Sequence, residues 1–257
     1  RNLGPVMNSL KGVYEVSSGK YCLVLFDDDY LIDSSYIRSA AELLERRPDV
    51  VYVFGGVYHN DIIEQKVRRV IADQPEIVHG HDLFLNFKSA KYPIMPSVNT
   101  ILFRRDIVVE HKCLQSPTNA VAGDMFFQLR MMLHGNVGFI RRIAVVYNLH
   151  TGSMSRNIDN RATGDGGTDH NKAVATAVDD VKGLHMIYED AVKLYRFNKD
   201  AMDKWLANRI YNYLYWRLNE TVQTRNELDA LLNFVKETFP DFYRVFKDFT
   251  DEKYGTA

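Results

Sequence analysis

Residues 21–26 read YCLVLF, and three aspartates, DDD at residues 27–29, follow directly. An unbroken apolar run of this length, rich in residues that favour strands, predicts a buried strand that pairs in parallel with its neighbours. In open α/β sheets, ligands bind outside the carboxyl ends of such strands. We therefore expect Asp27, Asp28 and Asp29 to lie at a ligand crevice.

The segments that follow continue an alternation of helices and strands. A helix is predicted after the capping residues 33–35, because Ile37, Ala41 and Leu44 follow at spacings of four and three. The other candidates of this half are a strand at 50–54 closed by Gly55-Gly56, a strand at 100–103, a helix at 125–133 after Gly123-Asp124, and extended segments from 137 to 147 interrupted at Arg141-Arg142. This order predicts an α/β fold with a Rossmann-like, mostly parallel sheet.

The remainder of the chain has a different composition. Residues 151–171 are dominated by Gly, Ser, Asn, Asp and Thr, which is typical of a loop or linker. Residues 173–238 show helical spacing of aromatic and other apolar side chains and no strand pattern. The sequence therefore predicts an α/β domain at 1–155, a flexible linker at 156–172 and a C-terminal helical subdomain of about three helices at 173–257.

Composition and charge exclude several classes of protein. With 46% hydrophobic and 25% charged residues among 257, the chain is neither disordered nor fibrous. Its 32 Lys and Arg against 33 Asp and Glu give a formal charge of −1, which predicts no nucleic-acid partner. Cys22 and Cys113 form no CxxC pair, and no apolar run is long enough to cross a bilayer. We therefore expect a cytoplasmic protein without a zinc module.

The three aspartates favour a cation site. Adjacent carboxylates repel one another, and a bound cation relieves that repulsion. In an extended chain Asp27 and Asp29 face one side while Asp28 faces the other. Carboxylate oxygens of this kind suit Mg²⁺ or Mn²⁺, above all where the metal also carries substrate phosphates. A solvated acidic turn before the following helix is the alternative that the spacing leaves open.

Two other classes of function also remain open. A phosphatase of the haloacid-dehalogenase type would use Asp27 as its nucleophile. Leu31, however, stands where that pattern has Thr or Val, and residues 123–128 lack the second of its later carboxylates. The other class is a non-catalytic interaction module built on the helices of residues 173–257.

Several short motifs occur in the order in which family 2 glycosyltransferases of the GT-A fold carry them. They are NLG at residues 2–4 with Asn8, GKY at 19–21, LFDDDYL at 25–31, FRR at 103–105, GD at 123–124, and YNLH at 147–150 followed by Ser153 and Ser155. The chain from Asn2 to Ser155 resembles this family, with Tyr30 at a position that is usually acidic. The strands that normally come first and hold the nucleotide base are not in the sequence, so we expect a partial domain.

The resemblance implies a metal-dependent glycosyltransferase that inverts the anomeric centre of the sugar. The residues it implies are the catalytic base Asp124, the metal ligands Asp29 and His150, and the donor-binding residues Asp27, Asp28 and Arg156. A mixed carboxylate and imidazole set would favour Mn²⁺ over Mg²⁺.

The resemblance also implies partners. They are a nucleotide-sugar donor such as a UDP-sugar, and a glycan or lipid-linked acceptor in polysaccharide or glycoconjugate synthesis. Residues 97–99 would border the acceptor. The helices of 173–257 would make a peripheral contact with the inner face of the membrane. The Gln-x-x-Arg-Trp element of processive members is absent after Asp124, so we expect one sugar to be added per binding event.

Overall fold

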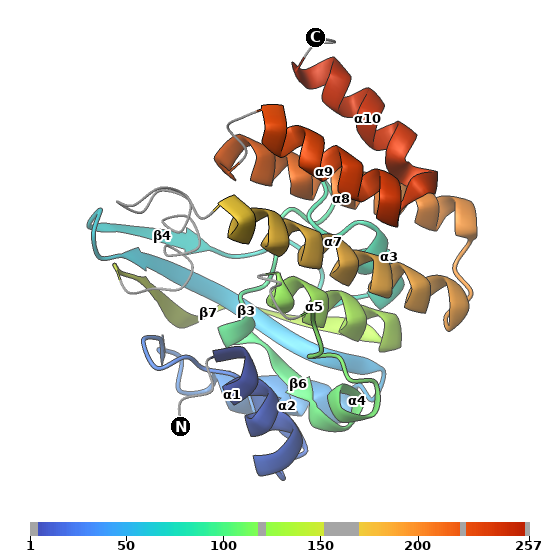
Figure 1. Ribbon diagram of the computed structural model, residues 1–257. Coiled ribbons are helices and arrows are strands. Elements are labelled where there is room, and N and C mark those ends of the chain that lie inside the picture. Colours follow the sequence, from blue (N-terminus) through green and yellow to red (C-terminus); the bar gives the residue numbers. More distant parts are fainter. Residues whose placement is uncertain (1–4, 118–121, 152–169, 222–224, 255–257) are drawn as a thin grey trace. The chain divides into compact units, whose positions relative to one another are not determined.

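The computed structural model describes residues 5–117, 122–151, 170–221 and 225–254 (Figure 1). Its contacts divide the chain into two compact units. Unit 1 comprises residues 1–115 and 123–156, and unit 2 comprises residues 116–122 and 157–257. The sheet and the helices that cover it belong to unit 1, and the described helices from residue 170 onward belong to unit 2.

Unit 1 is built on a seven-stranded mixed sheet. Its main path has the order β1-β6-β3-β7-β2, while β4 pairs with β3 and β5 with β7. The strands are β1 (Tyr21–Leu23), β2 (Tyr30–Leu31), β3 (Val50–Asp61), β4 (Lys66–Val70), β5 (Ile77–Val78), β6 (Leu102–Arg104) and β7 (Asn136–Leu149). The long β3–β7 pair is parallel and forms the centre, and the shorter pairs around it are antiparallel. The predicted α/β class is correct, and the sheet is more mixed than predicted.

Helices cover both faces of this sheet. Leu102 of β6 belongs to the apolar cluster under α2 (Tyr36–Arg46). The next residue, Phe103, points to the opposite face and contacts Phe127 of α5 (Gly123–His134), with ring centroids 5.1 Å apart. The shorter helical segments of the unit are α1 (Pro5–Lys11), η1 (Gly12–Val16), α3 (Gly80–Leu85), η2 (Val98–Thr100) and α4 (Arg105–Glu110).

The helix predicted after residues 33–35 is α2, but its buried face is shifted by one residue. Tyr36, Ala40, Leu43 and Leu44 are buried against the sheet, whereas Ile37 is 44% exposed. The reason is that Tyr36 supplies the largest apolar surface of the first turn, and its hydroxyl reaches inward to donate to the carbonyl oxygen of Thr100.

The predicted strand at 21–26 differs most from the structure. Only Tyr21–Leu23 pair, and their partner β6 is antiparallel rather than parallel. Leu25 is 39% exposed, and the Asp29 amide donates to the Phe26 carbonyl oxygen at 3.2 Å, which closes a turn. The chain therefore leaves the sheet before the aspartates, and the expected alternation of their side chains along an extended strand does not occur.

Two predicted breaks in the central pair are continuous strand. Gly55-Gly56 lie inside β3, where a Cβ on Gly55 would come within 2.9 Å of the Tyr36 ring. These glycines permit close packing rather than ending the strand. Arg141 and Arg142 likewise lie inside β7, where the register shifts from Gly55–Ile140 to Gly56–Ile143. The predicted interruption is therefore a bulge.

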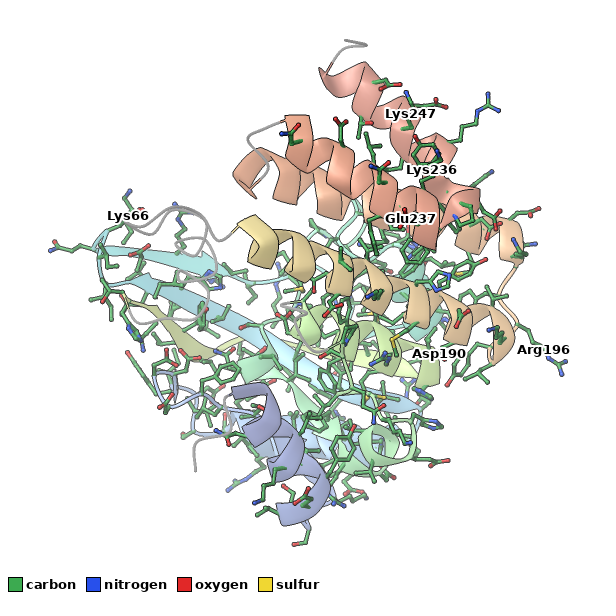
Figure 2. All side chains as sticks on the ribbon, viewed as in Figure 1. Lys66, Asp190, Arg196, Lys236, Glu237 and Lys247 are labelled. Carbon is green, nitrogen blue, oxygen red and sulfur yellow. The ribbon has the colours of Figure 1, made fainter. Side chains whose placement is uncertain are left out.

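The β3–β4 hairpin extends from the sheet and carries basic side chains. Lys66 lies at its tip (Figure 2), and its ammonium group lies 3.1 Å from Glu64 Oε2. The hairpin pairs Asp61 with Lys66 and Tyr58 with Arg69.

The described part of unit 2 contains four helices, α7 (His170–Lys193), α8 (Lys199–Thr221), α9 (Arg225–Thr238) and α10 (Pro240–Tyr254). The sequence predicted about three helices in the subdomain at 173–257. Helical spacing was recognised only as far as residue 238, so α10 was missed, although Pro240 is a favourable first helical residue. Leu184, Trp205 and Val235 from three of the helices are buried in the unit. Among the described residues, no helix is long and apolar enough to span a bilayer.

Candidate active site at the acidic turn

The three aspartates lie between two short strands of unit 1. Asp27 and Asp28 form a turn after β1, and the chain then enters β2, which pairs Tyr30 with Val146 of β7. This pairing brings the turn beside the end of β7, which contains Asn148 and is followed by His150. The sheet, rather than sequence proximity, therefore assembles the site.

Asp29 is buried and held by two hydrogen-bond donors. Asp29 is only 7% exposed to solvent. Asn99 Nδ2 donates to its Oδ2 at 2.7 Å, and the Asn148 backbone N–H donates to its Oδ1 at 2.9 Å. Burial raises the pKa of Asp29 above its ordinary value, and the two hydrogen bonds oppose that rise. The charges of Asp28 and Asp27 raise the pKa of Asp29 further.

Asp28 faces the imidazole of His150. The distance from His150 Nε2 to Asp28 Oδ2 is 3.1 Å. The side chain of Asn148 fixes the backbone beneath this pair, because its Nδ2 donates to the Asp28 carbonyl oxygen at 2.6 Å. Asn60 Nδ2 in turn donates to Asn148 Oδ1 at 2.8 Å. The structure thus places His150 beside Asp28, whereas the resemblance implied His150 and Asp29 as the metal ligands. Asp27 is exposed at the surface.

The chemistry of these groups fits a divalent cation that is shared with a substrate. Among the described residues, no three His, Cys, Asp or Glu side chains converge as a protein-only metal site requires. Asp28 and His150 nevertheless present a carboxylate oxygen and an imidazole nitrogen close together, a donor pair suited to Mn²⁺. Both Asp29 oxygens already accept hydrogen bonds. Phosphate oxygens and water would complete the coordination.

Asp124 lies in the first turn of α5, as predicted. Its Oδ1 accepts a hydrogen bond from the Met125 backbone N–H at 2.8 Å. Burial raises the pKa of Asp124, while this hydrogen bond and the charge of Lys88 lower it. The net direction is upward. A carboxylate with a raised pKa is the better proton acceptor, whereas a simple helix cap would have a lowered pKa.

Some site residues were foreseen and others were not. Arg156, predicted to bind the donor, lies outside the described residues. Asn99, predicted to border an acceptor, is fully buried against Asp29. The support from Asn60 was missed, because nothing in its local sequence indicates that β3 places it beside Asn148.

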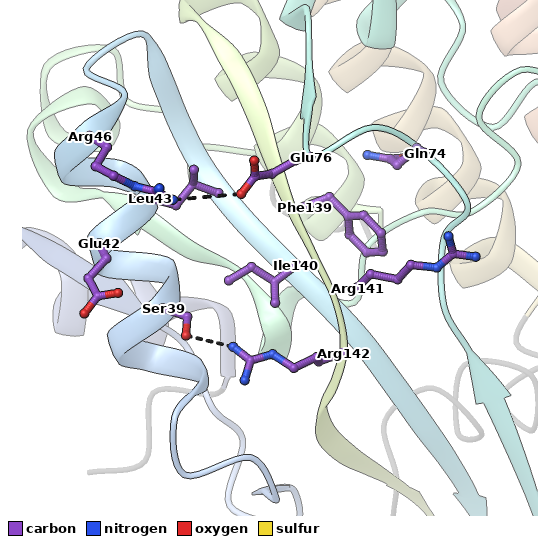
Figure 3. Close-up of a pocket in the computed structure, with 10 residues that line it drawn as sticks. All are labelled: Ser39, Glu42, Leu43, Arg46, Gln74, Glu76, Phe139, Ile140, Arg141 and Arg142. Carbon is purple, nitrogen blue, oxygen red and sulfur yellow. Dashed lines mark hydrogen bonds and ion pairs between the residues drawn. The ribbon is translucent and has the colours of Figure 1, made fainter.

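A separate cleft of about 470 Å³ lies between α2 and β7 (Figure 3). The residues that line it include the apolar Leu43, Phe139 and Ile140 and the charged Arg46, Glu76 and Arg142. Arg142 Nη2 donates to Ser39 Oγ at 2.7 Å, and Arg46 lies 3.9 Å from Glu76. No residue of the acidic turn lines this cleft.

No protein-family model matches the sequence, and no curated protein matches it. Among solved structures, the chain is similar to a glycosyltransferase structure, the crystal structure of S. aureus TarS 1–349. The match covers 100% of this chain and 73% of the TarS chain, with a TM-score of 0.59 and 10% sequence identity. An identity this low establishes the fold alone. The predicted GT-A-like fold is therefore confirmed, and the site has to be argued from its own geometry.

Proposed function

We propose that the protein is a metal-dependent, inverting glycosyltransferase that moves a sugar from a nucleotide-sugar donor to a hydroxyl group of an acceptor. The observation that carries this proposal is the acidic turn, where Asp28 and His150 converge and Asp29 is buried beside them. The glycosyltransferase fold supports the same class of reaction. A buried carboxylate with a raised pKa, such as that of Asp29, is typical of a functional site.

In the proposed reaction, Asp124 acts as the general base. Its carboxylate removes the proton of the acceptor hydroxyl while that oxygen forms a bond to the anomeric carbon. The bond from the anomeric carbon to the donor phosphate oxygen breaks in the same step, and the nucleoside diphosphate leaves with the electron pair. Attack from the face opposite the leaving group inverts the anomeric centre.

Asp28 and His150 would hold the cation, and Asp29 would fix the turn that carries Asp28. A bound Mn²⁺ or Mg²⁺ supplies positive charge that stabilises the departing diphosphate. Asp27 is exposed and takes no part in the hydrogen bonds that hold Asp29, so its carboxylate is available to the donor. This assignment moves the direct metal contact from Asp29 to Asp28.

The donor class in the proposal is a nucleotide sugar such as a UDP-sugar. The acceptor class is a glycan or a lipid-linked glycan, and the enzyme would work in the cytoplasm, with a peripheral contact to the membrane when its acceptor is lipid-linked. Arg156, six residues after His150 in the sequence, would contact the donor.

A thermal-shift panel of nucleotide sugars with and without Mn²⁺ tests the proposal. A ligand that binds only the native state at 100 times its Kd stabilises it by about 2.7 kcal/mol, so a true donor should raise the Tm in the presence of Mn²⁺. The Asp28→Ala variant should lose this rise, and Asp73→Ala, at an exposed aspartate paired with Arg141, should keep it. A wild-type Tm that no nucleotide sugar raises, with or without Mn²⁺, would contradict the proposal.

A further inference from the structure

Two fully buried amide side chains in unit 1 use only half of their hydrogen-bonding capacity. Asn99 in η2 donates from Nδ2 to Asp29 Oδ2 at 2.7 Å, and Gln128 in α5 donates from Nε2 to the Pro96 carbonyl oxygen at 2.9 Å. Both residues have zero exposure. Within the described part of the chain, Asn99 Oδ1 and Gln128 Oε1 find no hydrogen-bond donor.

The partners of these amides force this arrangement. A carboxylate oxygen and a carbonyl oxygen can only accept, so the NH₂ group of each amide must face its partner. The amide oxygen then points the other way, into surroundings that offer it no donor. Leaving a buried acceptor unpaired lowers the stability of the native state. A core built for stability alone would have apolar side chains at both positions.

The two amides act on one short segment. Gln128 holds its first residue, Pro96, and Asn99 extends from it to Asp29. Between them the segment is tightly folded, because both the Oγ1 and the backbone N–H of Thr100 donate to the Ser97 carbonyl oxygen, at 2.8 and 2.9 Å.

α2 fixes the other end of this segment, since the Tyr36 hydroxyl donates to the Thr100 carbonyl oxygen. The segment from Pro96 to Thr100 is thus a rigid link between α5 and the acidic turn.

The helix at one end of this link carries Asp124. Gln128 follows Asp124 by four residues, so the two side chains lie on the same face of α5. Asp29, at the other end, is adjacent to Asp28 and accepts a hydrogen bond from the Asn148 backbone N–H. The link therefore connects the two places where the proposed reaction needs charged groups.

We propose that Asn99 and Gln128 are positioning residues that set the acidic turn relative to α5, at the expense of two unpaired buried oxygens. The catalytic meaning of this role rests on the proposed function, whereas the mechanical coupling does not.

Asn136, at the opposite end of β7, is an amide with a purely structural role and serves as the control. Its Nδ2 donates to Asp49 Oδ2 at 2.6 Å and its Oδ1 accepts from the Gly80 N–H at 3.2 Å, so both halves of this amide are used.

Hydrogen exchange of single backbone amides tests the coupling. The Asn148 N–H reports the position of the Asp29 carboxylate directly, because it donates to that group. In Gln128→Met, which removes the hydrogen bond and the unpaired oxygen together, we expect the Asn148 N–H to exchange about tenfold faster, the change that loss of roughly one hydrogen bond produces. Exchange of the Val53 N–H in the central strand should not change, and the Tm should stay the same or rise.

Asn99→Ala should accelerate exchange of the Asn148 N–H by more than Gln128→Met, because it frees Asp29 itself. The control Asn136→Ala should lower the Tm and leave exchange of the Asn148 N–H unchanged. If exchange of the Asn148 N–H is the same in Gln128→Met as in the wild type, the coupling is wrong, whatever the protein catalyses. If exchange accelerates as expected while no nucleotide sugar binds the wild type, positioning stands and the proposed function fails.

Mn²⁺ alone provides a second readout. Titration calorimetry should show weaker Mn²⁺ binding in Asn99→Ala by about tenfold, because the turn that carries Asp28 is no longer fixed. Asn136→Ala should bind Mn²⁺ as the wild type does. Equal affinity in Asn99→Ala and the wild type would overturn the positioning role of Asn99.

Discussion

Two charged regions of unit 1, the acidic turn and the cleft beside α2, are organised in opposite ways. In the cleft, each arginine has an anionic or hydroxyl partner at the surface: Arg142 lies 3.3 Å from Asp33 and Arg46 lies 3.9 Å from Glu76. In the turn, Asp29 is buried, held by amide donors rather than by cations, and its pKa is raised.

This difference shows that the presence of a cleft is not enough to identify the active site. Exposed ion pairs neutralise each other at little cost or gain in stability. A buried carboxylate without a cation is costly to keep charged, and a fold retains it where the charge is used. The turn, rather than the cleft beside α2, is therefore the candidate active site.

The largest effect is expected at Asp124. If Asp124 is the base, Asp124→Asn should lower kcat by about a thousandfold, within the range that general bases contribute. Asp106 is a matched control, because it opens α4 and accepts the Ile107 N–H at 2.9 Å as Asp124 accepts the Met125 N–H. Asp106→Asn should leave kcat unchanged, since Asp106 is exposed.

The pH dependence of the wild type sharpens this prediction. Burial raises the pKa of Asp124, so its basic form is lost at a higher pH than for an ordinary aspartate. As the pH falls through that raised pKa, kcat/KM should fall with it. The acid limb should disappear in Asp124→Asn, and a limb that persists in the variant would assign the titration to another group.

An intermediate effect is expected at the Asp28–His150 pair. Asp28→Asn and His150→Ala should each weaken Mn²⁺ binding by at least about tenfold, as measured by calorimetry. Because the two groups are 3.1 Å apart, the double variant should lose less than the sum of the single losses. His79→Ala, an exposed histidine elsewhere in unit 1, should bind Mn²⁺ normally. Unchanged affinity in His150→Ala would remove His150 from the site.

The sequence predicted the elements whose signals are local. The helix at 125–133 is α5, because Gly123-Asp124 and Gly135 mark its ends within the same short stretch. The strand at 50–54 is the first part of β3. The three aspartates could be selected as candidate site residues because adjacent carboxylates repel one another, a cost that a bound cation or a solvated turn relieves.

The parts that could not be predicted depend on distant residues. β1 pairs antiparallel with β6, which is distant in the sequence, and neither strand's own residues specify that pairing or its direction. Asp29 is held by Asn99 and Asn148, residues 70 and 119 positions away. Gly55-Gly56 were predicted to end the strand, although a side chain on Gly55 would collide with Tyr36 and one on Gly56 with Ile143. Local pattern thus predicts elements, and tertiary contacts decide which carboxylate meets which partner.

The smallest effect is expected in the cleft, at Arg142. Arg142→Met removes hydrogen bonds to Ser35 and Ser39 and the ion pair with Asp33, yet these groups are partly exposed, so the free energy of unfolding should fall by less than about 1 kcal/mol at neutral pH. The hydrogen bonds from Ser35 are the main cause of the lowered pKa of Asp33, and Arg142 adds to it. A carboxylate with a lowered folded-state pKa stabilises the protein above its unfolded pKa and loses that contribution as the pH falls through the folded value. The difference in unfolding free energy between variant and wild type should therefore shrink in acid, as denaturant titrations at several pH values would show.

Mn²⁺ affinity and kcat should be unchanged in Arg142→Met, and a large loss of either would place the cleft within the active site.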